Sequence, residues 1–437
     1  MERSASFFQR FFRIETLGGL VLLLFAIAAL ILANSPLESV YRACWQTRFS
    51  IGLGNAALGL TLQQWINDGL MALFFLLVGL EIKRELLAGE LASLKQATLP
   101  IAAAVGGMAV PAALYWSLNR SGPAADGWGI PMATDIAFAL GALALIAPHA
   151  PTGLKVFLAA LAIADDMGAI LVIAIFYSGD IAWSALGAAG GVVAILVALN
   201  LTGVVKLWPY VLCGMVLWFF VHESGIHATI AGVALAMAIP TRTRLNAAEF
   251  SREARALLGQ FDRSETGDLL VLTSKGQQES LFALERASEE ATAPILRLEH
   301  ALHRFSAFAV MPLFALANAG VHIGGPITQT GVALGVTAGL VIGKPLGIFG
   351  ASVIAVKCGL ATLPEGMRWG SLLGAACLAG IGFTMSLFIA MLAFGDPALI
   401  ETAKVAVLAA SLLAGVSAAV VLNTFGRVRP EPGYAGT

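Results

Sequence analysis

The chain has 437 residues, of which 58% are apolar and only 12% are charged, and its mean hydropathy is +0.84. A soluble domain carries about 25% charged residues, so this composition excludes a soluble globular protein and predicts an integral membrane protein. The net charge of −1 gives no indication of nucleic-acid binding. The four cysteines are scattered without a metal-ligand spacing, so we expect no structural disulfide.

Long apolar runs alternate with short polar gaps, which is typical of membrane helices rather than of barrel strands. The first run follows Arg10 and Arg13, as in a signal peptide, but it lacks an A-x-A cleavage pattern and is interpreted as a retained helix. We predict an all-α integral membrane fold, a single domain over residues 1–437, with spans at 17–34, 65–82, 97–119, 128–147, 154–177, 181–201, 207–222, 225–240, 304–322, 331–356, 370–394 and 398–424.

The placement of Lys and Arg predicts the orientation. With the N-terminus inside, 21 of the 26 basic residues lie in inner segments, four lie outside and Lys344 lies within a span. Basic residues concentrate on the cytoplasmic side of membrane proteins, so both termini are expected in the cytoplasm. The segment 41–60 is then an outer loop.

The segment 241–300 differs from the rest of the chain, because its 60 positions hold 8 basic and 10 acidic residues. Leu281, Leu284, Leu296 and Leu298 are spaced as in amphipathic helices. We predict a long charged cytoplasmic loop that contains helical pieces.

Four ionisable residues fall well inside predicted spans: Asp135, Asp165, Asp166 and Lys344. A charged group at mid-membrane costs about 2.5–3.5 kcal/mol on insertion scales. Asp165 lies about 17 Å along its span, since a helix rises about 1.5 Å per residue, so the acidic pair is expected near the bilayer midplane. A packing ion pair with Lys344 explains one of the acids, but three acids against one base leave a net negative site.

Residues that break helices stand beside these charges. Pro131 and Thr134 precede Asp135, and Gly380 and Gly382 lie in the eleventh span with Thr384 and Ser386. Interrupted helices in corresponding halves of a transporter indicate a binding site at the midplane. Pro345 cannot donate a hydrogen bond to the carbonyl of Val341, so a helix carbonyl is freed near Lys344.

Several segments carry a resemblance to a known family. ATDIAFALG (133–141), LAIADDMGAI (161–170), GIHATIAG (225–232), GLVIGKPLGI (339–348) and GIGFTMSLFIA (380–390) resemble the NhaA family of sodium/proton antiporters. WINDGLMALFFLLVGLEIKREL (65–86) and MPLFALANAGV (311–321) add to the match, which runs from about residue 12 to residue 426.

The resemblance implies about twelve transmembrane helices with two inverted three-helix repeats, spans 3–5 and 10–12, and interrupted, crossing helices 4 and 11. It implies a multi-pass protein of a bacterial cytoplasmic (inner) membrane, a homodimer, which exchanges Na⁺ or Li⁺ for H⁺ in pH and sodium homeostasis. By motif, Asp166 resembles the main ion-binding and proton-binding carboxylate, and Asp165 beside it pairs with Lys344. Thr134 and Asp135 belong to the unwound part of span 4. The residues that match positions linked to the pH response are Glu81, Arg84, Glu85, His227, Glu299 and His300.

The chemistry of the residues agrees with this function. Na⁺ and Li⁺ are hard cations that prefer oxygen ligands, and protons compete for the same carboxylates, so exchange is expected to be activated at alkaline pH. A proton-coupled solute symporter also uses buried acids but needs a larger substrate pocket. An intramembrane aspartyl protease needs two acids as well, but on separate helices, whereas Asp165 and Asp166 are adjacent.

Overall fold

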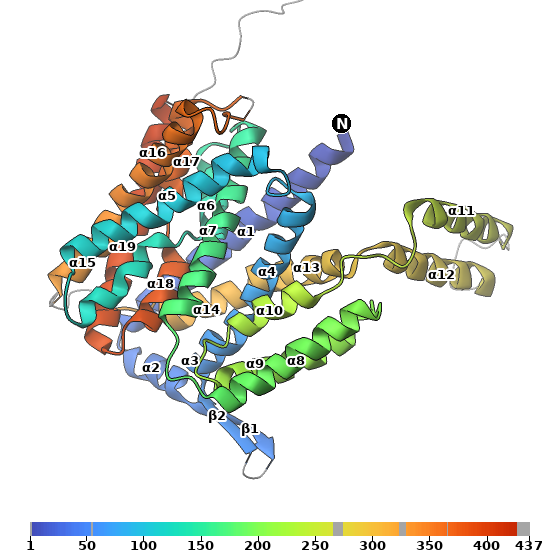
Figure 1. Cartoon of the computed structure of the whole chain (residues 1–437), viewed down its shortest axis with the longest axis horizontal. Helices are drawn as coiled ribbons and strands as arrows, with labels where there is room; N and C mark the ends of the chain where they lie inside the picture. The colour runs from blue at the N-terminus through green and yellow to red at the C-terminus, as the bar shows by residue number, and fades with distance from the viewer. Residues whose placement is uncertain (1, 54–55, 265–273, 323–328, 365, 426–437) are drawn as a thin grey trace, which may run out of the picture.

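The computed structural model describes residues 2–53, 56–264, 274–322, 329–364 and 366–425, and it is a helix bundle with one small β-hairpin (Figure 1). The elements as far as the ninth α-helix are α1 (Glu2–Ala33), α2 (Glu38–Gln46), β1 (Arg48–Leu53), β2 (Ala56–Thr61), α3 (Leu62–Gln64), η1 (Trp65–Leu70), α4 (Met71–Ala88), α5 (Leu94–Leu118), η2 (Pro123–Met132), α6 (Ile136–Ile146), α7 (Thr152–Phe176), α8 (Trp183–Leu201) and α9 (Leu207–Glu223).

The remaining elements include two π-helical turns, η4 and η5, inside long helices. They are α10 (Ile230–Ala238), α11 (Ala247–Arg263), α12 (Lys275–Ala291), α13 (Pro294–Phe305), η4 (Ser306–Val310), α14 (Met311–Asn318), α15 (Thr330–Ala338), η5 (Gly339–Gly343), α16 (Lys344–Lys357), α17 (Trp369–Leu378), α18 (Phe383–Ala393) and α19 (Pro397–Phe425).

Ten of the twelve predicted spans have a counterpart that is long and apolar enough to cross a membrane. Seven are continuous helices, and three are pairs bent at a short break. The other two predicted spans correspond to α9, which has 17 residues, and to α10, which has nine. Nine helical residues rise about 14 Å, against a hydrocarbon core of about 30 Å. The structure therefore supports a multi-pass helical membrane protein but does not establish twelve full spans.

The predicted all-α fold is confirmed apart from one short segment between the first two spans, which is predicted as an outer loop and contains a β-hairpin. After α2, strands β1 and β2 pair antiparallel, from Arg48 opposite Thr61 to Leu53 opposite Ala56. Along β1, Phe49 and Ile51 alternate with smaller residues, which is the period of a strand rather than of a loop. The hairpin is attached to the bundle by the indole of Trp65, whose Nε1 donates to the carbonyl of Phe49 at 2.9 Å.

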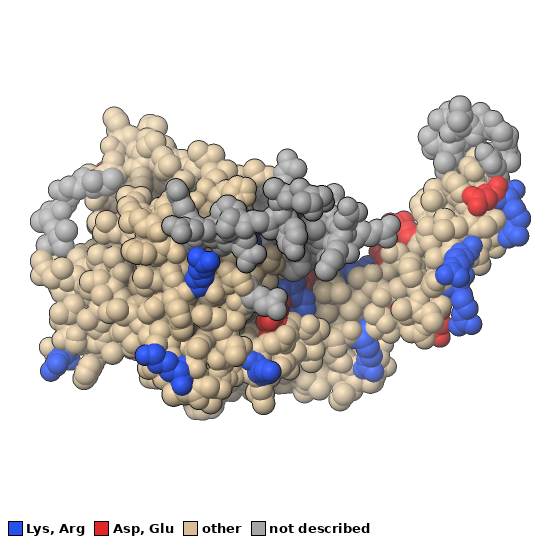
Figure 2. Space-filling model, turned by 90° about the horizontal axis from the view of Figure 1, so that it is seen from above, with Lys and Arg blue, Asp and Glu red and all other residues tan. Residues whose placement is uncertain are grey.

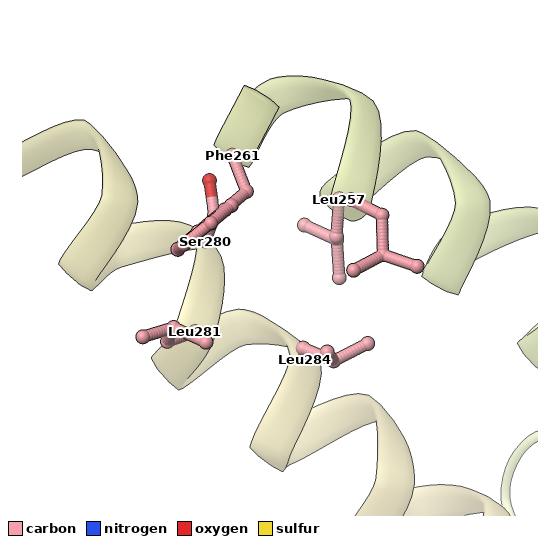
Figure 3. A pocket seen from close by; sticks show the side chains of 6 residues that line it. Leu257, Phe261, Ser280, Leu281 and Leu284 are labelled. Atoms are coloured by element: carbon pink, nitrogen blue, oxygen red, sulfur yellow. The ribbon is translucent and has the colours of Figure 1, made fainter. Parts of the chain in front are cut away.

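The charged segment after α10 is mostly helical. Helices α11 and α12 pack side by side, and this pair, which we call the arm (residues 247–263 and 275–291), projects from the bundle on the right of Figure 1. Figure 2 shows acidic and basic side chains gathered on this projection and at its base. Its two helices meet around the apolar pocket of Figure 3, which is lined by Leu257, Leu258, Phe261, Ser280, Leu281 and Leu284.

The ninth span begins earlier than predicted. Its first helix, α13, starts at Pro294, ten residues before the predicted boundary at 304. The end of the predicted loop is therefore part of a membrane-length helix that runs on through η4 into α14. This places Glu299 on a helix that packs against α4, rather than in a loop.

Glycines let α5 and α16 approach each other closely. A methyl group on Gly106 would overlap the carbonyl oxygen of Gly347, and one on Gly347 would overlap the carbonyl oxygen of Gly106. Small residues at such contacts let helix backbones pack together in membranes. Because Lys344 lies one turn before Gly347, this contact also sets the position of Lys344 relative to α5.

We expect Gly347→Ala to lower the stability of the folded protein by about 1–3 kcal/mol, the usual cost of overpacking. Thermal unfolding of the purified protein measures this. The matched control is Gly350→Ala in the same helix, where an added methyl group would meet no atom within 4 Å. If both variants melt at the wild-type temperature, the glycine contact does not hold α5 and α16 together.

Candidate functional site

The two interrupted spans meet at their breaks. Between η2 and α6 the chain bends by 46°, and between α17 and α18 it bends by 47°. The N–H of Asp135 donates to the carbonyl of Ile381 at 2.8 Å, and the hydroxyl of Thr134 donates to the carbonyl of Ala379 at 2.8 Å. The interruptions predicted in spans 4 and 11 are thus present, and each break supplies hydrogen-bond partners to the other.

The carboxylate of Asp135 lies at the N-termini of two helices. Its Oδ1 accepts from the N–H of Phe138 at 3.0 Å, which caps α6. Its Oδ2 accepts from the N–H of Thr384 at 3.2 Å and from the hydroxyl of Thr384, at the start of α18. A helix N-terminus carries about half a positive charge. One buried carboxylate therefore balances both half-helices.

Asp165 and Lys344 form a buried ion pair. Lys344 Nζ lies 2.6 Å from Asp165 Oδ2, and each side chain is only 1% exposed. Lys344 is the first residue of α16, and its own N–H donates to the carbonyl of Gly339, which closes the π-helical turn η5. Pro345, which has no N–H, follows directly and shifts the hydrogen-bond register at this point. The pairing of the two charges agrees with the sequence analysis.

Asp166 is also buried, and among the described residues it has no ion-pair partner. It is 3% exposed, and within the described part of the chain neither its Oδ1 nor the Oδ1 of Asp165 accepts a hydrogen bond. The carboxylates of Asp165, Glu81 and Asp135 and the ammonium of Lys344 all act on it electrostatically. Buried acceptors without partners are costly. The site thus keeps an excess of negative charge and free oxygens that a cation or a proton can satisfy.

A second cluster of charges joins α4 to α13. Arg84 is hydrogen-bonded to Glu299 and, at 3.0 Å, to Glu85. Glu81 lies 3.9 Å from the Nδ1 of His303. Four of the six residues assigned to the pH response, Glu81, Arg84, Glu85 and Glu299, are therefore close together, and Glu81 also acts on Asp166.

The two predicted histidines lie outside this cluster. His300 is exposed on α13, whereas His303, one turn beyond Glu299, faces Glu81. The i, i+4 spacing of Glu299 and His303 is the signal that the sequence analysis missed, because such residues share a helix face. His227 lies elsewhere, with its ring edge-on to Phe388 at 5.2 Å and its Nδ1 3.1 Å from the hydroxyl of Thr229.

Comparison with known proteins identifies the family of the chain. The family described as Na⁺/H⁺ antiporter 1 matches residues 9–422. The Na⁺/H⁺ antiporter NhaA of Oleidesulfovibrio alaskensis is 49% identical over 97% of this chain and 95% of its own length. Those of Wolinella succinogenes and Helicobacter pylori are each 47% identical, over 93% and 95% of this chain and 90% and 94% of their own lengths. The chain belongs to the NhaA family of Na⁺/H⁺ antiporters. It is therefore a secondary transporter and not an enzyme, which removes the protease alternative.

We expect Lys344→Ala to destabilise the protein by about 3–5 kcal/mol, because it leaves the carboxylate of Asp165 buried and unpaired. Adding Asp165→Asn should restore part of this loss. Thermal unfolding of both single variants and the double variant gives the coupling energy. Strictly additive losses would show that the two charges do not stabilise each other.

Proposed function

We propose that this chain exchanges Na⁺ for H⁺ across the cytoplasmic membrane of a bacterium, with Asp165 and Asp166 as the shared binding site and both termini in the cytoplasm. The observation that carries the proposal is the buried, uncompensated carboxylate of Asp166 beside the Asp165–Lys344 pair. Family membership gives the class of transported ion. Li⁺, another hard cation that prefers oxygen ligands, is proposed as an alternative substrate.

Ion binding would use oxygens only. The carboxylates of Asp165 and Asp166 supply the negative charge. Further oxygens would come from Thr134, Asp135 and the backbone at the two breaks, which lie on the neighbouring spans. A proton on Asp166 removes the charge that attracts the cation, so the two ions compete. No ATP or soluble cofactor is needed, because the gradient of one ion drives the movement of the other.

Alternating access would open this one site to each side in turn. The crossing is suited to such a movement, because α6 and α18 are short and are joined to η2 and α17 by breaks rather than by continuous helix. A small tilt of these half-helices changes which end of the site faces water, while Asp135 keeps the two N-termini together.

The cluster around Arg84 is proposed to add a response to cytoplasmic pH. It combines three acids, a histidine and an arginine on α4 and α13, and Glu81 connects it electrostatically with Asp166. A change of charge in this cluster alters the field at the ion site and the packing of α13 on α4. His303 rather than His300 is the histidine placed to take part.

We expect Asp166→Asn to abolish Na⁺-driven proton movement, because it removes the charge that binds both ions. Exchange is measured with a pH-sensitive dye in proteoliposomes supplied with Na⁺, Li⁺ or K⁺. The matched control is Asp180→Asn, since Asp180 is exposed, and it should retain exchange. Normal exchange by Asp166→Asn would contradict the proposed site, and equal transport of an organic solute would favour the symporter.

We expect exchange to rise from acid to alkaline pH, with a midpoint that moves to lower pH as Na⁺ increases. More cation displaces protons from the same carboxylates, so less alkaline conditions suffice. Rates measured against pH at several Na⁺ concentrations test this, and a midpoint wholly independent of Na⁺ would rule out a shared site. The component that saturating Na⁺ does not move should change in His303→Ala and remain in the exposed control His300→Ala.

A further inference from the structure

The first half of the fourth span is an unusually long 3₁₀-helix. Segment η2 runs for ten residues, from Pro123 to Met132. Runs of 3₁₀-helix longer than 3–4 residues are uncommon, because their hydrogen bonds have poorer geometry than those of an α-helix. The segment leads directly into Thr134 and Asp135, so the contacts that fix η2 also help to fix the positions of these two residues.

Side chains from α5, from α18 and from the residue that follows α7 hold η2 by its backbone. The hydroxyl of Tyr177 donates to the carbonyl of Asp126 at 2.8 Å and accepts from the N–H of Gly129 at 3.2 Å. The hydroxyl of Tyr115 donates to the carbonyl of Ala124 at 2.7 Å. The hydroxyl of Ser386 donates to the carbonyl of Ile130 at 2.8 Å. Of the three, Tyr177 alone makes two bonds to the segment.

The approach of Tyr177 requires a glycine opposite it. A methyl group on Gly129 would lie 2.6 Å from the hydroxyl oxygen of Tyr177, which is too close for unbonded atoms. The next ring along the segment, that of Trp128, stacks on Tyr177 with centroids 6.3 Å apart and meets Phe176 edge-on at 5.1 Å. The hydroxyl of Tyr177 therefore packs closely against Gly129 while its ring packs against Trp128.

Tyr177 follows the last residue of α7, the helix that carries Asp165 and Asp166. It is eleven residues beyond Asp166, about 16 Å along a helix, so its hydroxyl does not contact an ion there. We propose that Tyr177 is a positioning residue for the ion site: by joining the end of α7 to η2, it fixes Thr134 and Asp135 relative to Asp165 and Asp166.

The variant Tyr177→Phe tests this, because it keeps the stacked ring and removes both hydrogen bonds. A net hydrogen bond contributes about 0.5–1.5 kcal/mol, and we expect the KM for Na⁺ to rise about three- to tenfold with Vmax changed less than about twofold. The pH midpoint at fixed Na⁺ should move to alkaline values, because a more weakly bound cation displaces protons less well. A general loss of stability would lower Vmax without moving KM or the midpoint.

The matched control is Tyr210→Phe in α9. Tyr210 is fully buried, donates to one backbone carbonyl, that of Val204 at 2.8 Å, and belongs to an apolar cluster that contains no residue of η2 or α7. This variant should lose stability and keep the wild-type KM for Na⁺. If it raises KM as much as Tyr177→Phe does, or if Tyr177→Phe leaves KM and midpoint unchanged, the positioning role is wrong.

A second variant approaches the same contact from the other side. Gly129→Ala retains the hydroxyl but pushes it away, so it should raise the KM for Na⁺ as well, and its effect should not add to that of Tyr177→Phe. Should Tyr177→Phe fail to fold, a wild-type KM in Gly129→Ala overturns the proposal. Additive effects of the two variants would also overturn it.

The inference rests on the proposed transport of Na⁺ and H⁺. Amide hydrogen exchange tests the contact between Tyr177 and Gly129 independently of that transport. The N–H of Gly129 should exchange faster in Tyr177→Phe than in the wild type, whether or not the protein transports Na⁺. If the wild-type protein does not exchange Na⁺ for H⁺, only the proposed function is contradicted. Unchanged protection of Gly129 contradicts the Tyr177 contact alone.

Discussion

The ion pair between Asp165 and Lys344 holds two charges, each 1% exposed, inside a bundle that offers them little water. Removing one partner of such a pair costs about 3–5 kcal/mol, so the surrounding helices must keep the two atoms within hydrogen-bonding distance. The glycine contact of α16 with α5 and the π-helical turn before Lys344 both help to set the position of Lys344. The remaining charged groups of the site therefore surround Lys344, whose charge is already paired with that of Asp165.

A second constraint comes from two membrane-length segments that are interrupted where they contact each other. Backbone groups freed at a break have no water to bind in the hydrocarbon region, and each must find a partner within the protein. Here the breaks satisfy each other, through Thr134 with Ala379 and Asp135 with Ile381. The side chain of Asp135 then offsets the partial positive charges of two helix N-termini with one carboxylate. Without this carboxylate, the partial positive charges of the two helix N-termini would repel a cation bound near them.

The parts of this site that the sequence could predict are those that local chemistry determines. Breaks were expected at Pro131 and at the glycines around Gly380, and Lys344 was the one base deep enough to pair with Asp165. The β-hairpin was missed because its alternation is short and was interpreted as loop. The i, i+4 spacing puts His303 on the same helix face as Glu299, but only the packing of α13 on α4 shows that this face is the inward one. The contacts of Thr384 and Tyr177 depend on the register between distant helices, which no single segment contains.

Adjacent carboxylates differ in what surrounds them although they share a depth. Successive helix residues point about 100° apart, so Asp165 meets Lys344 while Asp166 is left among other acids. A carboxylate in that position is costly when it is empty and ionised, and binding of either a proton or a cation relieves the cost. In the proposed mechanism, a site that is unfavourable without an ion changes sides more readily when it carries one. In the proposed mechanism this asymmetry couples the two ions, because the site returns across the membrane only after the second ion has replaced the first.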